Sequence, residues 1–203
     1  MSTVGVFGCQ FGGWYEDLVS GWFESVLSVG ADQIVFASDH HWDVPADVTL
    51  LVMESEHEVH PAADFLNAAI SMLSTDWCWP LDVDDRFRPD CLDMIVDDAD
   101  VVAVGMMRSD GVSVIPRSIS AEWVLQSKSN PVNACSPFRR SVWEATGGYP
   151  NIGFWDWGFW RLVAQTGARF VCSHRVAYDY RLDVHSHSHR MDTNVGIKEV
   201  MSL

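Results

Sequence analysis

The first 85 residues contain neither lysine nor arginine. They hold 15 acidic residues, whereas residues 86–203 hold 13 acidic and 13 basic ones, so the whole net charge of −15 arises before Arg86. Clustered basic side chains drive general nucleic-acid binding, and their absence argues against that function. A phosphorylated ligand near this acidic half would need a metal ion to mediate its binding. The alternative is an acidic surface that serves solubility alone.

The sequence also lacks a run of about 18 apolar residues, so we expect no membrane span. Residues 1–9 have no basic region of the signal-peptide type and are typical of a first strand. The odd number of cysteines and the absence of C-x-x-C spacing argue against a disulfide or zinc framework. These features predict free thiols in a reducing cytoplasm for Cys9, Cys78, Cys91, Cys135 and Cys172.

The first part of the chain alternates strand and helix patterns. Apolar residues recur every four positions over residues 14–30, which predicts an amphipathic helix ended by Gly30. Two further helices, each opened by a proline, are predicted over 61–73 and 88–98. Short apolar, β-branched runs predict strands at 3–8, 33–38, 47–53, 77–81 and 100–107. Strand–helix–strand units of this kind form parallel sheets.

The second part is more mixed. A turn after residue 107 predicts a hairpin into an antiparallel strand, and residues 168–181 contain another strand pattern. Helices are predicted over 120–128, 139–146 and 156–167, whereas the histidine-rich last twenty or so residues show no clear pattern. With neither repeats nor low-complexity linkers, the chain predicts one α/β domain over residues 1–203, Rossmann-like over 1–107. Ligands of such sheets bind beyond the carboxyl ends of the strands.

Three aspartates, Asp82, Asp84 and Asp85, follow the buried run at 77–81. Like charges this close repel, and burying them is costly unless a positive charge lies among them. In extended backbone, residues two apart face the same way, so Asp82 and Asp84 can present two oxygens to one point. Two hard ligands with open positions suit Mg²⁺ or Mn²⁺ completed by water and phosphate. A solvated aspartate-rich turn is the alternative.

Two other kinds of site known to use such aspartates fit this segment less well. A calcium loop of the EF-hand type needs Gly at its sixth and Glu at its twelfth position, where this chain has Phe87 and Asp93. Phosphatases of the haloacid-dehalogenase class also use D-x-D, but normally after the first strand, not some 80 residues into the chain. A metal-dependent phosphatase stays open as an alternative function.

The ordered set of features resembles glycosyltransferase family 2 over nearly the whole chain. Asp39 follows the second predicted strand, and the matching segments are "FESVL" (23–27), "LNAAI" (66–70), "WPLDVDDRFRPDCLDMI" (79–95), "FRRSVWEATGGYP" (138–150), "FWDWGFWRLVAQTGARF" (154–170) and "YRLDVHSHS" (180–188). The resemblance implies the GT-A fold, a mixed central sheet flanked by helices. It also implies a nucleotide-sugar-binding half at 1–107, then an acceptor-side half and C-terminal tail at 108–203.

The resemblance assigns residues to the donor site. Asp39 would hold the base or ribose, and Arg181 would lie near the diphosphate. The D-x-D motif would be Asp82 and Asp84, with Asp84 the more direct metal ligand, and His185 would lie near the metal. Gly147 and Gly148 form the family's GG-aromatic turn and would approach the donor; a helix C-cap is the alternative.

The implied activity is metal-dependent, inverting transfer of a hexose from a nucleotide sugar, with a UDP-sugar as the expected donor. Asp156 would be the general base that takes the proton from the acceptor hydroxyl. The expected cofactor is Mn²⁺ or Mg²⁺, a Lewis acid that offsets charge on the departing nucleoside diphosphate. An aspartate at the start of a helix also explains Asp156 without catalysis.

Two departures from the family pattern support a second hypothesis. Leu66 stands where arginine is common, and Trp155 replaces the usual glutamate before Asp156. A degenerate relative that binds a nucleotide or sugar without transferring it would fit both.

The identity of the acceptor is open. It could be a glycan, a lipid, a protein or a modified DNA base, although the acidic first half of the chain fits DNA poorly. His185, His187 and His189 share one face on a strand and suit a metal, or form a solvated tail.

Overall fold

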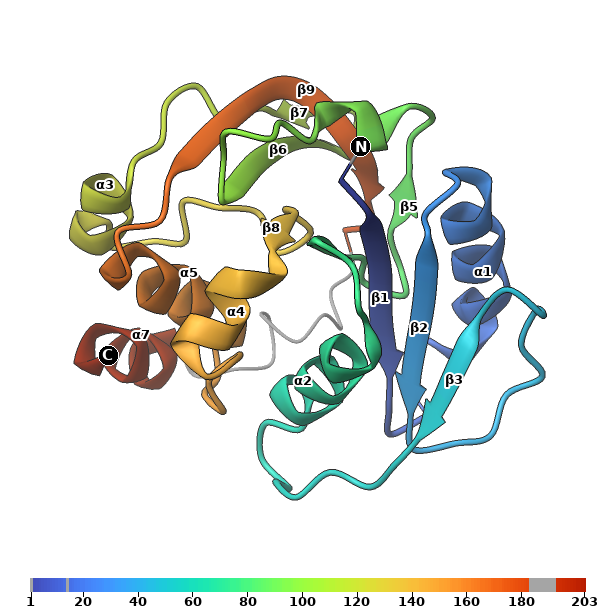
Figure 1. The fold of residues 1–203 in the computed structure, drawn as a ribbon. Helices are drawn as coiled ribbons and strands as arrows, with labels where there is room; N and C mark the ends of the chain where they lie inside the picture. Colours follow the sequence, from blue (N-terminus) through green and yellow to red (C-terminus); the bar gives the residue numbers. More distant parts are fainter. Residues whose placement is uncertain (1, 14, 183–192) are drawn as a thin grey trace.

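A curled mixed sheet forms the centre of the molecule (Figure 1). The computed structural model describes residues 2–13, 15–182 and 193–203. Within them the strand order is β3-β2-β1-β4-β8-β6-β9-β5, with β7 paired to β6. The strands are β1 Val4–Gln10, β2 Gln33–Ser38, β3 Thr49–Val52, β4 Trp77–Pro80, β5 Arg86–Phe87, β6 Val101–Arg108, β7 Ser113–Val114, β8 Phe138–Arg139 and β9 Phe170–Tyr180.

The first four strands are parallel, as the sequence predicts. β8 then runs antiparallel to both β4 and β6, and β9 pairs in parallel with β6 and antiparallel with β5. The predicted hairpin is confirmed, since β7 pairs antiparallel with β6. All four parallel strands therefore end at one edge of the sheet, where the aspartates follow β4.

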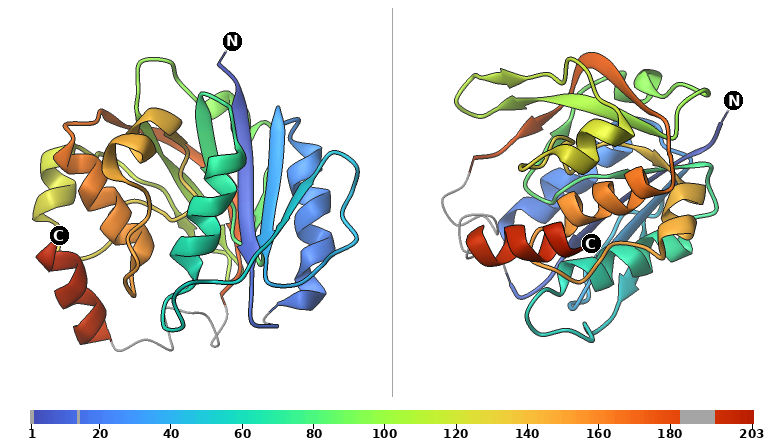
Figure 2. Two further views of the ribbon diagram at one scale, coloured as in Figure 1. Left: turned by 60° about the horizontal axis from the view of Figure 1, so that its bottom comes forward. Right: turned by 90° about the vertical axis from the view of Figure 1, so that its left-hand side faces the viewer.

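Helices cover both faces of the sheet (Figure 2). Successive strand residues point to opposite faces, so Val6 packs with α1 while Phe7 packs with α2. The helices α3, α4 and α5 bury their apolar residues on the α2 side, and α7 contacts α5. The helices are α1 Val19–Ser28, α2 Ala62–Met72, α3 Ala121–Gln126, α4 Arg140–Thr146, α5 Trp155–Gln165 and α7 Thr193–Ser202.

The prediction of a helix over 88–98 is wrong. Arg86 and Phe87 instead form β5, and the Arg88 amide donates to the Ala177 carbonyl of β9 (2.8 Å). Asp90 then takes a left-handed conformation (φ 58°), and a single 3-10 turn follows over Cys91–Met94. The sheet thus takes the backbone donors at the start of this segment, and too few residues remain for an α-helix.

Other boundaries differ less. A short 3-10 turn over Glu16–Leu18 precedes α1, whose ten residues are fewer than the predicted span. The helix α7 was not predicted because only Gly196 and Val200 of it are buried, so it carries almost no apolar stripe. None of the described helices has both the length and the apolar character needed to cross a membrane. All five cysteines are free, as predicted.

Asn67 joins the two halves of the chain. Its Oδ1 accepts from the Trp143 indole N–H (2.9 Å) and the Tyr149 amide (2.8 Å), and its Nδ2 donates to the Tyr149 carbonyl (2.9 Å). Gly148 has φ +99°, and a Cβ there would lie 2.5 Å from Oδ1 of Asn67. Close packing against this amide therefore requires glycine at position 148.

Asn67→Ala should lower the free energy of unfolding by about 2–3 kcal/mol, because it leaves part-buried donors and an acceptor without partners. Urea denaturation measures this loss. Ser71→Ala, on the exposed face of the same helix, is the matched control and should change stability by less than about 0.5 kcal/mol. Equal stability of the two variants would show that Asn67 does not join the halves.

Candidate active site

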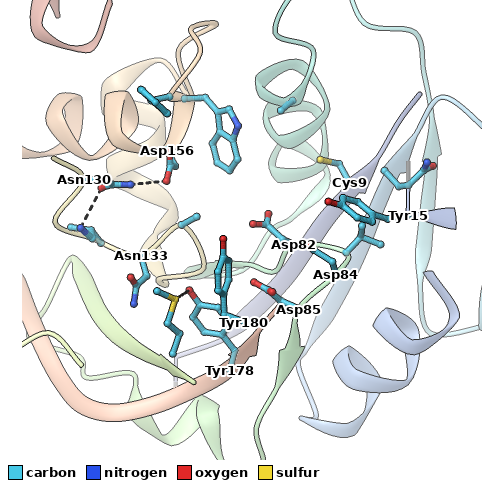
Figure 3. Close-up of a pocket in the computed structure, with 18 of the residues that line it drawn as sticks. Cys9, Tyr15, Asp82, Asp84, Asp85, Asn130, Asn133, Asp156, Tyr178 and Tyr180 are labelled. Carbon is cyan, nitrogen blue, oxygen red and sulfur yellow. Dashed lines mark hydrogen bonds between the residues drawn. The ribbon is translucent and has the colours of Figure 1, made fainter. Parts of the chain in front are cut away.

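A cavity of about 390 Å³ lies at the edge where the parallel strands end. Its walls come from segments far apart in sequence: residues 9–11 at the end of β1, the turn 82–85 after β4, the loop around 130–134, residues 153–156 at the start of α5, and the end of β9. Asp82, Asp84 and Asp156 all line it. Figure 3 shows Asp156 facing the aspartate turn across the cavity. The structure thus brings two of the predicted metal ligands, Asp82 and Asp84, and the predicted base into one cavity.

Arg86 shapes the aspartate turn. Its guanidinium donates to the backbone carbonyls of Val83 (2.9 Å), Asp85 (2.6 Å) and Leu18 (3.0 Å). The turn closes through the Asp85 amide, which donates to the Asp82 carbonyl (3.0 Å). The first cation of the chain therefore binds the backbone behind the carboxylates.

The three carboxylates differ in environment. Asp85 is fully buried; its Oδ1 accepts from the Arg181 amide (2.9 Å), and the Cys135 thiol donates to its Oδ2 (3.7 Å). Asp82 and Asp84 are partly exposed to the cavity. One oxygen each of Asp82 and Asp85 and the Cys135 sulfur lie within 4.8 Å of one another, an arrangement that a metal ion could occupy. The spacing of the three aspartates does not indicate which of them is buried, so the sequence assigns Asp85 no separate role.

The electrostatics of the cavity disfavour ionised carboxylates. Burial raises the pKa of Asp82 to about 7, and the negative charges of Asp84 and Asp156 act in the same direction. Burial also raises the pKa of Asp156 to about 6, against hydrogen bonds from backbone amides at the start of α5 and from Asn130. Among the described residues that line the cavity there is no lysine, arginine or histidine. A bound cation would relieve this repulsion and lower both pKa values.

The other predicted donor-site residues lie around the cavity. Asp39, at the end of β2, accepts from the Gly12 amide (2.8 Å) and contacts the His40 ring, one strand away from the cavity wall. Arg181 follows β9 and reaches Asp85 through its backbone. Gly147 ends α4 in a left-handed conformation, so Gly147 and Gly148 have a structural role outside the cavity lining. His185 lies outside the described residues, and so do His187 and His189. Their ligand roles stay predictions.

Comparison with known proteins relates the chain to solved structures. Neither a protein-family model nor a curated protein sequence matches it. S. aureus TarS residues 1–349 in complex with UDP-GlcNAc align with TM-score 0.76 and 15% identity, covering 98% of this chain and 64% of that one. Mannosyltransferase PcManGT from Pyrobaculum calidifontis, in complex with GDP-Man and Mn²⁺, aligns with TM-score 0.65 and 16% identity over 92% of this chain and 59% of that one.

A second S. aureus TarS structure aligns with TM-score 0.69 and 13% identity, covering 90% of this chain. The chain spans 37% to 64% of the length of these three structures. The likeness shows the fold: a mixed α/β sheet of the glycosyltransferase GT-A type, with helices on both faces. The predicted fold class is confirmed.

Asp82→Asn should stabilise the metal-free protein at alkaline pH. The pKa of Asp82 is about 4 in the unfolded chain and about 7 in the folded protein. Between these two pH values the folded state therefore carries a proton on Asp82 that the unfolded state has lost. The free energy of unfolding of the wild-type protein therefore falls as pH rises through this window. The variant should gain on the order of 1–3 kcal/mol at pH 8 and little near pH 4.

Urea denaturation in EDTA across this pH range measures the effect. Asp93→Asn, an exposed aspartate beyond the turn, is the control and should follow the wild-type pH dependence. If Asp82→Asn also showed the wild-type pH dependence of stability, the Asp82 carboxylate would be solvated, and its ionised form would not destabilise the fold.

Proposed function

We propose that this chain is a metal-dependent, inverting glycosyltransferase that uses a nucleotide-sugar donor, with a UDP-sugar as the expected one. One observation carries the proposal: Asp82, Asp84 and Asp156 line one cavity at the carboxyl edge of a GT-A-type sheet. Two of the similar structures hold UDP-GlcNAc and GDP-Man with Mn²⁺, which supports a donor of this class.

In this proposal Asp82 and Asp84 hold Mn²⁺ or Mg²⁺, with His185 as a further ligand. The fit rests on the donor set. The hard carboxylate oxygens of Asp82 and Asp84 face the cavity, burial raises the pKa of Asp82, and no described lining residue supplies a positive charge. When bound, the ion would supply Lewis-acid stabilisation of the leaving diphosphate. Asp39 and Arg181 are the proposed donor contacts. Gly147 and Gly148 lie outside the cavity lining, so their donor contact stays a prediction of the resemblance.

Asp156 is the proposed general base. Its pKa of about 6 leaves it ionised at neutral pH yet makes it a stronger base than an ordinary aspartate. It lies across the cavity from the D-x-D turn, so an acceptor hydroxyl between them would have the base on one side and the donor on the other (Figure 3). Trp155 lines the cavity beside it and offers an aromatic face to a sugar or nucleobase.

A binding protein without transferase activity is the second candidate. Trp155 favours it, because this tryptophan lines the cavity where the resemblance leads us to expect a glutamate. Leu66 does not favour it, since this side chain of α2 is 3% exposed in the core and lies outside the cavity lining.

A phosphatase is a third candidate, which an activity assay with simple phosphate esters would test. We further propose a cytoplasmic location, in keeping with the free cysteines, and leave the acceptor as a glycan, lipid, protein or modified base.

Asp84→Ala should remove metal-dependent donor binding and lower transfer together, by about 10³-fold, because Lewis-acid stabilisation is worth several kcal/mol. Calorimetric titration of UDP-sugars and GDP-sugars with and without Mn²⁺, followed by a transfer assay with the donor that binds, measures both. Asp93→Ala, an exposed acid nearby, should retain both properties. Full turnover in Asp84→Ala would refute the proposed metal site.

Asp156→Asn should leave donor affinity within about threefold of the wild-type value and lower transfer by roughly 10²–10⁴-fold, the usual contribution of a general base. The same titration and assay separate the two effects. A variant that binds donor and transfers normally would place the base elsewhere. Donor binding without transfer by the wild-type protein, over a broad acceptor panel, would support the binding protein instead.

A further inference from the structure

Asn130 contacts the proposed base directly. Its Nδ2 donates to Oδ2 of Asp156 at 2.6 Å, and both residues line the cavity (Figure 3). The two residues are 26 positions apart: Asn130 lies in the loop between α3 and β8, whereas Asp156 lies in the first turn of α5. Neither the resemblance nor the residue spacing assigns Asn130 a role.

The loop holds the Asn130 amide in one orientation. Its Oδ1 accepts from the Val132 amide (3.3 Å), so turning the amide over would set its oxygen against the carboxylate and its NH₂ group against an N–H. Pro131 restricts Asn130 to extended backbone. On the other side, the Ser127 hydroxyl donates to the Ser129 carbonyl (2.6 Å) and closes the turn that precedes Asn130. The donor is therefore set in place before any substrate arrives.

A donor held in this way acts on the orientation and charge of Asp156. A hydrogen bond is stronger to a carboxylate than to a neutral carboxyl group, so Asn130 favours the ionised form. Backbone amides of Asp156 and Trp157 act in the same direction, and burial acts against all three. With one oxygen bound to Asn130, the carboxylate cannot rotate freely, and its remaining lone pairs keep a constant direction.

Other titratable groups around Asp156 do not replace this donor. Burial raises the pKa of Asp82, across the cavity, and that of Tyr149, between α4 and α5, and the negative charge of Asp156 adds to both shifts. Glu199 of α7 accepts from the Gly153 amide (3.0 Å) just before α5, so it adds a further negative charge on that side. These neighbours of Asp156 are thus acidic or neutral.

We infer that Asn130 is a positioning residue, which holds the Asp156 carboxylate ionised and aimed into the cavity for proton abstraction. This inference deepens the proposed function and rests on it. Asn130 itself gains and loses no proton. Asp156 takes the proton of the acceptor hydroxyl, and the hydroxyl oxygen forms the new bond to the anomeric carbon while the bond from that carbon to the diphosphate oxygen breaks. The nucleoside diphosphate leaves with the electron pair of that bond.

The test measures Asp156 itself. Carboxyl ¹³C NMR titration, with the Asp156 resonance assigned by difference from Asp156→Asn, gives its pKa in the wild-type and variant proteins. Asn130→Ala should raise this pKa by about one to two units, the worth of one hydrogen bond to a charged group. Asn130→Asp, which keeps the shape but adds a negative charge, should raise it at least as far.

Asn133→Ala is the matched control. Asn133 lies in the same loop and cavity wall, but its amide donates to the Val104 carbonyl (2.6 Å) instead of to Asp156. This variant should leave the Asp156 pKa in place, whatever it does to the rate. An unchanged Asp156 pKa in Asn130→Ala, or an equal shift in Asn133→Ala, would overturn the inference.

Enzyme kinetics separate this inference from the proposed function. In a transfer assay, the acid limb of the kcat/KM profile should move to higher pH in Asn130→Ala by the shift that NMR gives. A uniform loss of rate at every pH, with no movement of this limb, would contradict the positioning role. Absence of transfer by the wild-type protein with every donor would refute the proposed function, and the NMR titration would still decide whether Asn130 holds Asp156 ionised.

Discussion

The bonds that Arg86 makes behind the aspartate turn determine the character of the site. Its guanidinium is occupied by three backbone carbonyls, and Gly21 of α1 allows this approach, since a Cβ there would lie 2.5 Å from Nη2. The only lysine or arginine among the first 86 residues therefore shapes the turn without lining the cavity. The carboxylates in front of it stay strained, and a cavity of this kind binds an anionic ligand only together with a cation.

Two sets of acids face one another across this cavity, and their surroundings differ. Asp82 is opposed by like charges, which a metal ion would relieve, whereas Asp156 has Asn130 and backbone amides that favour its ionised form. Carboxylates with different environments can carry different functions, one holding a cation and the other accepting a proton. The GT-A-type sheet brings them together because β4 ends, and α5 begins, at the same edge.

Sequence periodicity predicted the parallel half of the sheet well, because strands buried on both faces read as continuous apolar runs. It could not predict β5 and β8, which have two residues each and exist only through pairing with distant strands. The same pairing explains the missing helix at 88–98. The D-x-D turn and Asp156 were marked by local patterns and a resemblance, and the structure places them in one cavity, while their roles stay predictions.

The amino-acid sequence by itself determined the alternation of strands and helices, the crowding of three aspartates after a buried strand, and the lack of basic residues before Arg86. These are local properties of composition and spacing. Only the tertiary structure decided that Asp85 is buried against Cys135, 50 positions away, while Asp84 faces the cavity, and that Asn130 binds Asp156. Such contacts depend on the paths of separate loops, and no periodicity in the chain records them.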